Sequence, residues 1–190
     1  RLDYLNPPGN NLAFCLTTEK LLGVEIPDRA NALRVIMCEL SRIASHLVWL
    51  GTHALDIGAM TVFLYCWRER EMILDLNEEI SGVRMMTSYI RIGGVAKDAT
   101  RPWLDGIRDF IEYFPPKVDE YERLLTKNPI WLDRTEGIGA FTREEAINWS
   151  LSGPALRASG VNWDIRKSQP YSGYDNYNFD IPVLNNGDIY

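Results

Sequence analysis

The chain has 190 residues, 46% of them hydrophobic and 24% charged, with a formal net charge of −6 and a pI near 5.0. This balance predicts a globular fold with room for a sizeable core. The acidic charge argues against a nucleic-acid surface, which normally carries a basic excess. Charged residues interrupt every apolar stretch, so we expect no transmembrane segment in this chain.

Helical patterns occupy the first part of the chain. We expect a short helix over residues 11–22, with Gly23 in the stop position, and a long helix over residues 28–58. Apolar residues with 4-3-4-3-4 spacing predict the buried stripe of the long helix: Ile36, Leu40, Ile43, Leu47, Leu50 and Ala54.

Further helices are expected beyond the long one. A helix over residues 61–80 carries the charged block 68–71, which predicts a solvated or intersubunit face. Residues 84–91 are expected to form another helical piece. A helical pattern over residues 102–127 contains Pro115-Pro116, and these prolines should kink it or divide it into two helices.

The C-terminal part changes in character. Thr142 and Glu145 form a capping-box pattern, which predicts a short helix over residues 142–150. Residues 151–190 combine Pro and Gly breakers with many Tyr and Asn and predict an extended, irregular segment. We therefore predict a mainly α fold, with a helical-bundle core in residues 1–150 and a loop-rich segment in residues 151–190 packed on it.

One face of the long helix lacks the Lys and Glu of an ordinary solvated surface. At about 100° per residue, Val48, Thr52 and Asp56 form a row on the side opposite the apolar stripe. The row suits the wall of a cavity, or packing against another segment with one hydrogen-bonded Asp. His46 and His53 lie on the same helix, either as a metal pair or, as is commoner, as structural histidines.

The cysteines and the chain ends carry no local chemistry. Cys15, Cys38 and Cys66 lie in apolar stretches without any CxxC pair, so we expect buried thiols in a reducing compartment and no metal or cluster bound by this chain. The chain begins with Arg1 and shows no secretory leader. We expect it to be a fragment of a longer subunit.

Motifs along the whole chain carry a family resemblance. In chain order they are RLDYL at residues 1–5, TEKLLG at 18–23, ELSRIASHL at 39–47, GTHALDIGA at 51–59, RERE at 68–71, YIRIGGV at 89–95, YFP at 113–115, SGV at 159–161, WDIRK at 163–167 and QPY at 169–171. Together they resemble the 49 kDa quinone-pocket subunit of NADH:quinone oxidoreductase, which is respiratory complex I. The resemblance implies a helical bundle similar to the large subunit of nickel–iron hydrogenases, without the metal site.

The resemblance also implies site residues. In the family, the Tyr of the RLDY motif, here Tyr4, hydrogen-bonds a carbonyl of the quinone substrate. The Asp of the THALD motif, here Asp56, pairs with a His from an upstream loop, so Tyr4 and Asp56 are the expected catalytic residues. Val48, Thr52 and Phe63 are expected to line the quinone pocket beside Tyr4.

Partners follow from the same resemblance. We expect other complex I subunits, especially the terminal iron–sulfur cluster subunit, which would hold the cluster, and the membrane-arm subunit at the quinone channel. NADH-to-quinone electron transfer would be coupled to proton translocation. The expected location is peripheral, on the cytoplasmic side of a bacterial inner membrane, and the quinone is ubiquinone or menaquinone.

The sequence also departs from the family pattern. Asn6-Pro7-Pro8-Gly9-Asn10 follows Tyr4 and predicts a stiff loop there. The upstream His loop and the family's last quarter lie outside these residues, so the isolated fragment is predicted to be inactive. Two alternatives remain, a hydrogenase-like large subunit and a non-catalytic helical scaffold in which Tyr4 and Asp56 are structural.

Overall fold

The computed structural model describes residues 2–190, and the chain divides into two compact units, Arg1–Tyr121 and Glu122–Tyr190. The predicted mainly α fold is confirmed, with a single two-stranded sheet among the described residues. The sequence places its change of character at residue 150, and a domain boundary there stays a prediction.

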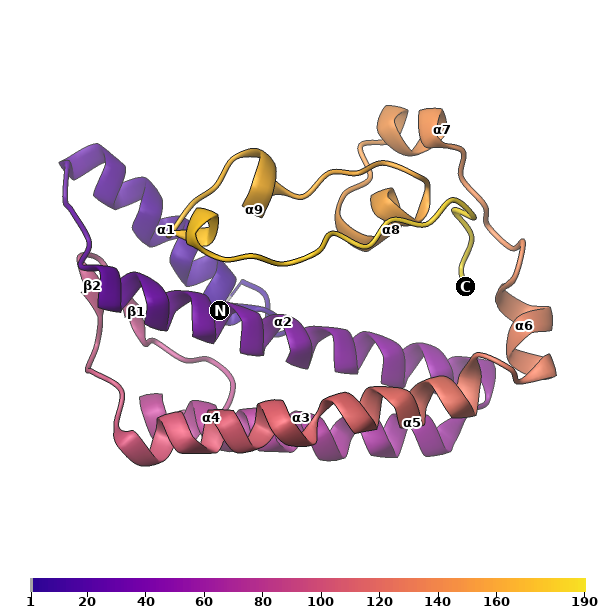
Figure 1. Cartoon of the computed structure of the whole chain (residues 1–190), viewed down its shortest axis with the longest axis horizontal. Helices are drawn as coiled ribbons and strands as arrows, with labels where there is room; N and C mark the ends of the chain where they lie inside the picture. The colour runs from indigo at the N-terminus through magenta and orange to yellow at the C-terminus, as the bar shows by residue number, and fades with distance from the viewer. Residues whose placement is uncertain (1) are drawn as a thin grey trace. The chain divides into compact units, whose positions relative to one another are not determined.

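A long helical hairpin forms the centre of the first unit. The elements of this part of the chain are α1 (Pro7–Leu22), α2 (Asp28–Ile57), α3 (Met60–Ser81), β1 (Ile90–Arg91), β2 (Gly94–Val95), α4 (Arg101–Tyr113) and α5 (Pro115–Leu125). Figure 1 shows α2 and α3 side by side, joined by a tight turn. Gly58 ends α2 in the left-handed region at φ 106°, where a residue without Cβ is favoured.

A buried row runs along α2, and its member Gly51 lies against α3. Its buried positions recur with 4-3-4-3-4-3 spacing: Leu33, Met37, Leu40, Ala44, Leu47, Gly51 and Ala54. A Cβ on Gly51 would lie 3.2 Å from the Cβ of Cys66, so the helices approach closely there. The predicted stripe shares alternate members with this row, whereas Ile36, Ile43 and Leu50 are only half-buried at its flank. The close approach at Gly51 favours a residue without a side chain at that position.

Helix α1 begins four residues earlier than the sequence predicts. The stiff loop expected after Tyr4 is wrong, because Pro7 and Pro8 start the first turn of α1. Proline fits this position because the first helical N–H groups have no intrahelical partner and its fixed φ is already helical. Asn6 caps the helix by accepting a hydrogen bond from the Gly9 amide at 3.2 Å.

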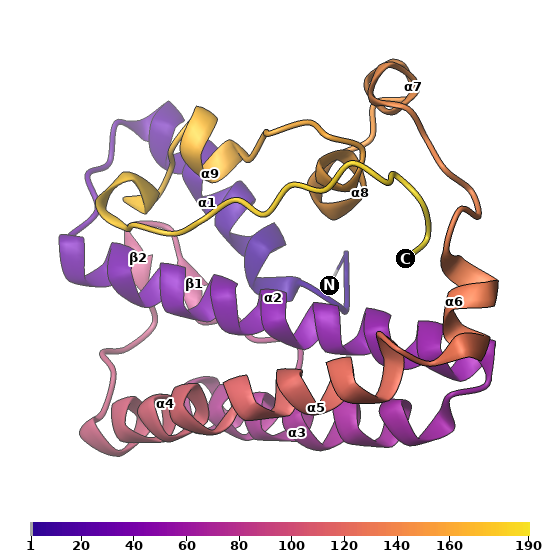
Figure 2. The same ribbon diagram turned by 45° about the vertical axis from the view of Figure 1, so that its right-hand side comes forward.

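A β-hairpin replaces the helical piece that was expected over residues 84–91. Figure 2 shows β1 and β2 beside the first half of α2, where Ile90 pairs with Val95. The Arg34 guanidinium of α2 donates to the carbonyl oxygens of Gly94 and Arg91, and the Glu19 carboxylate accepts the Gly93 amide. These tertiary bonds to the backbone favour an extended chain over a helix at this position.

Helix α4 and the first part of α5 lie along α3 in both views (Figures 1 and 2). Trp103 of α4 is fully buried, and its indole Nε1 donates to the Leu76 carbonyl at 2.9 Å. The predicted division at the two prolines is confirmed, since α4 ends at Tyr113 and α5 begins at Pro115.

Short helices and turns make up the second unit. Beyond the end of α5 it contains α6 (Pro129–Thr135), α7 (Arg143–Asn148), α8 (Gly153–Ala158), α9 (Ile165–Ser168) and the 3-10 turn η1 (Tyr174–Asn176). The predicted capping box of Thr142 and Glu145 is present at α7. The end of the chain returns to this region, because the Phe141 amide donates to the Gly187 carbonyl at 3.0 Å.

The three cysteines are buried and free, as predicted. Burial raises the pKa of all three thiols, to about 12 for Cys38 and for Cys66. Between residues 2 and 190, no helix is both long and apolar enough to cross a membrane.

Candidate functional site

Tyr4 lies just before α1, and α2 anchors the segment that carries it. The Ser41 hydroxyl of α2 donates to the side-chain oxygen of Asn6 at 3.1 Å, which fixes the start of α1 against α2. The Tyr4 side chain is 65% exposed, and its hydroxyl has no hydrogen-bond partner among residues 2–190. The phenol is therefore free to donate to a group from outside the described chain.

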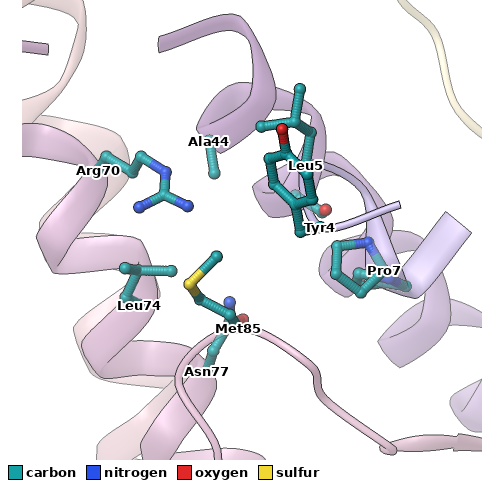
Figure 3. A pocket seen from close by; sticks show the side chains of 10 residues that line it. Tyr4, Leu5, Pro7, Ala44, Arg70, Leu74, Asn77 and Met85 are labelled. Atoms are coloured by element: carbon teal, nitrogen blue, oxygen red, sulfur yellow. The ribbon is translucent and has the colours of Figure 1, made fainter. Parts of the chain in front are cut away.

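A small hollow separates Tyr4 from α3. The hollow is partly open, and its volume of about 260 Å³ includes the space that is open to solvent. Figure 3 shows its walls, which α2, α3, the start of α1 and the chain after α3 provide. The lining residues are Tyr4, Leu5, Pro7, Pro8, Ser41, Ala44, Arg70, Leu74, Asn77 and Met85.

Arg70 supplies the positive charge of this hollow. Its side chain comes from α3 and extends toward the space between Ala44, Met85 and Tyr4 (Figure 3). The residue is only 8% exposed, and its guanidinium makes no hydrogen bond or ion pair with any other residue from 2 to 190. Burial lowers the pKa of Arg70, which reflects the cost of a desolvated cation.

The neighbouring acid on α3 is fully satisfied. Glu69 is completely buried and accepts hydrogen bonds from Tyr121 at 2.5 Å and Tyr113 at 3.0 Å, and Arg68 lies 2.6 Å away. The pKa of Tyr121 is raised mainly by burial and, as the second cause, by its hydrogen bond to the Glu69 carboxylate. The solvated or intersubunit face predicted for residues 68–71 agrees with the exposure of Arg68 and Glu71, whereas the two central residues, Glu69 and Arg70, are buried.

The predicted row of Val48, Thr52 and Asp56 on α2 is covered only partly, or not at all, by the rest of the described chain. Thr52 and Asp56 are exposed and Val48 is half-buried. The Thr52 hydroxyl donates to the Val48 carbonyl at 2.8 Å, and the Asp56 carboxylate makes no hydrogen bond or ion pair with residues 2–190. Phe63, near the start of α3, is half-buried with its ring centroid 4.2 Å from that of Trp67.

Asp56 lies away from the hollow that Tyr4 lines. The last residue of α2 in the lining is Ala44, and Asp56 follows Ala44 after 56 − 44 = 12 residues of the same helix. At about 1.5 Å per residue, this corresponds to about 18 Å along the helix axis. Of the predicted site residues, Tyr4 alone lines the hollow. The roles of Val48, Thr52, Asp56 and Phe63 stay predictions.

Comparison with known proteins decides the family. The pattern described as "Respiratory-chain NADH dehydrogenase, 49 Kd subunit" matches residues 56–190. The chain belongs to this 49 kDa family. It is 57% identical over 190 residues to a D-type subunit of the NADH-quinone oxidoreductase of Roseiflexus sp. (strain RS-1), and the match covers 100% of this chain and 46% of the relative.

Other relatives agree on the family and on the length. The D-type NADH-quinone oxidoreductase subunit of Geobacter sulfurreducens is 56% identical over 183 residues, covering 96% of the chain and 47% of the relative. The corresponding protein of Koribacter versatilis is 56% identical over 190 residues, which are 47% of that protein. This 49 kDa family chain therefore spans about half the length of the curated relatives it matches, and the resemblance predicted from its motifs is confirmed.

One residue of the hollow in this family chain was missed by sequence reasoning although a signal exists. Arg70, Leu74 and Asn77 have i, i+4, i+7 spacing, which places them on one face of α3, and Leu74 and Asn77 are buried. An Arg in register with an apolar Leu is unusual for a solvated face. The charged residues on both sides of Arg70 conceal this periodicity.

The two histidines, His46 and His53, do not form part of a metal site within the described chain. His53 stacks on Trp49 with ring centroids 5.9 Å apart, and His46 is exposed. Between residues 2 and 190, no group of three or more His, Cys, Asp and Glu side chains is placed to hold a metal ion.

Proposed function

We propose that the chain contributes one wall of the quinone-reduction pocket of NADH:quinone oxidoreductase, respiratory complex I. One observation carries this proposal: relatives named as D-type subunits of NADH-quinone oxidoreductase match the chain over its whole length at 57% identity. An activity that involves NADH and quinone is part of those names. The exposed Tyr4 beside the hollow supports a site at this place.

Tyr4 has the chemistry that quinone reduction needs. Reduction of a quinone to a quinol takes up two electrons and two protons, and negative charge develops on the carbonyl oxygens as the electrons arrive. A phenol with a pKa near 10 in water can donate a hydrogen bond or a proton to such an oxygen, and solvent can return the proton. In this proposal the electrons originate from NADH and reach the quinone through an iron–sulfur cluster in a partner subunit.

Asp56 is proposed to act through a histidine from another segment. A carboxylate next to a His stabilises its protonated form, and that His can then deliver the second proton. The Asp56 carboxylate is exposed and has no partner within residues 2–190, so it is available for such a pair. Val48, Thr52 and Phe63 would line the quinone pocket.

Neighbouring subunits would complete the pocket. Large apolar side chains are exposed near the turn between α2 and α3, as expected for a surface that another subunit covers: Trp49, Leu55, Met60 and Leu64. The proposed partners are the terminal cluster subunit and the membrane-arm subunit at the quinone channel. The complex would couple electron transfer to proton translocation, with this chain peripheral on the cytoplasmic side of a bacterial inner membrane and inactive alone.

Two substitutions in the intact complex test the proposal. Tyr4→Phe removes only the phenolic hydroxyl, and Asp56→Asn removes only the charge, so each should lower NADH:quinone kcat/KM by roughly tenfold or more. Asp109→Asn, at an exposed position on α4, is the matched control and should leave turnover unchanged. Unchanged kcat and quinone KM in both test variants would show that this pocket assignment is wrong.

A further inference from the structure

Arg70 is the charged group that the chemistry above leaves unused. It is 8% exposed, it lines the same hollow as Tyr4, and its Nε has no hydrogen-bond partner among residues 2–190. A buried cation without a partner is costly, so native proteins pair such groups. The geometry therefore leaves this guanidinium available to an oxygen ligand from outside the described chain.

The surroundings of Arg70 narrow the choice of ligand. The nearby acids of α3 are occupied elsewhere, because Glu69 is held by two tyrosines and Arg68, and Glu71 pairs with Arg84. The Asn77 amide nitrogen donates to the Arg84 carbonyl at 3.2 Å. Thus the side of the guanidinium that faces the hollow is the one that remains for a ligand (Figure 3).

We propose that Arg70 is a substrate-binding residue that donates hydrogen bonds to a carbonyl oxygen of the quinone headgroup in the hollow beside Tyr4. This inference rests on the proposed function. A planar guanidinium presents several N–H donors and no acceptor, so it matches a carbonyl oxygen and binds it more strongly as that oxygen gains negative charge.

The lining of the hollow, and not its size, agrees with a headgroup ligand, because the volume of about 260 Å³ includes space that is open to solvent. Apolar walls from Ala44, Leu74 and Met85 suit the ring, and Arg70 and Tyr4 supply the polar contacts. The contact should be tighter in the charged transition state, so kcat should fall at least as much as KM rises.

The test uses the intact complex with a short-chain quinone. Arg70→Met removes the charge at similar length and should lower kcat/KM by roughly 10- to 100-fold, as expected for loss of a charged hydrogen bond. Arg70→Lys keeps a charge but loses the fork of donors, and a smaller loss of about 3- to 10-fold is expected. NADH oxidation by an artificial acceptor that bypasses quinone, and the subunit content of the complex, should stay unchanged.

Controls separate this inference from the proposed function. Arg108→Met, at an exposed Arg of α4 that pairs with Asp105, should behave as the parent complex. If Tyr4→Phe impairs quinone turnover and both Arg70 variants do not, the role of Arg70 is refuted and the pocket stands. If none of the three variants changes quinone kinetics, the pocket fails as well.

A variant could also change the amount of assembled complex. Should Arg70→Met reduce the amount of complex, the Arg70→Lys variant decides the question, because it retains the positive charge. Normal quinone kinetics in Arg70→Lys, or failure of this variant also to assemble, would show that Arg70 supports the structure of the complex and does not bind the quinone, which overturns the inference. A specific loss of quinone kcat/KM in assembled Arg70→Lys complex supports it.

Discussion

The first unit buries two arginines in different ways. Arg34 is fully buried and satisfied: its guanidinium binds both oxygens of Glu19 and the carbonyls of Gly94 and Arg91. Arg70 is almost as deeply buried but has neither an acid nor a carbonyl as partner between residues 2 and 190. The contrast distinguishes a structural ion pair, closed within the chain, from a cation that is available to a ligand.

The largest effect on stability is expected at the buried ion pair of Arg34 and Glu19. Arg34→Met would leave the Glu19 carboxylate buried without its counter-charge, so the free energy of unfolding should fall by about 3–5 kcal/mol. Denaturant unfolding of the purified chain measures this. Arg29→Met is the control on the same helix, since Arg29 pairs with Asp98 at the exposed surface and should cost less than about 1 kcal/mol. Equal losses in the two variants would contradict the structural role of Arg34.

A smaller effect is expected in the pH dependence of folding stability, through Glu19. The hydrogen bond from Arg34 holds the pKa of Glu19 below its ordinary value of 4.5. The pair therefore stabilises the fold fully above about pH 4.5, and this contribution is lost as the pH falls through the lowered pKa. Unfolding measured between about pH 6 and pH 3 should show a steeper loss for the parent than for Glu19→Gln. Glu112→Gln, on the exposed side of α4, should keep the parent's slope; a parent no steeper than Glu19→Gln would refute the pairing.

The smallest effect on stability is expected at Arg70. Arg70→Met breaks no ion pair and relieves the desolvation of a charge, so the free energy of unfolding should change by less than about 1 kcal/mol. The Trp67 ring, 5.8 Å from the guanidinium carbon, adds only a weak cation–π contact. The same denaturant series provides the measurement. A loss as large as that of Arg34→Met would mean that the two arginines play the same structural role.

Local patterns in the sequence predicted much of the fold. Gly23, Gly58 and Gly82 end their helices in the left-handed conformation, and the capping box at Thr142 starts α7. Such signals act over one helical turn, so neighbouring residues carry them fully. The small helices α6, α8 and α9 were missed, because short turns between Pro and Gly breakers have little periodicity.

The site was predicted in part. Tyr4 came from its motif, and the structure places it beside a hollow, whereas Arg70 was missed because charged neighbours conceal its place on an apolar face. The separation between Tyr4 and Asp56 also depends on where α1 starts and how it packs. No local pattern encodes that packing, since Ser41 and Asn6 meet across 35 residues of chain.

By itself, the sequence determined the family, the mainly α character and the position of the long helices. Motif order and helical periodicity are properties of neighbouring residues, so the chain alone displays them. The tertiary structure alone decided which buried charges are paired. Arg34 and Arg70 have the same ionisable group, but Arg34 meets Glu19 and the β-hairpin from distant parts of the chain, and Arg70 meets an open hollow. Pairing depends on packing across sequence separations that local patterns do not reach.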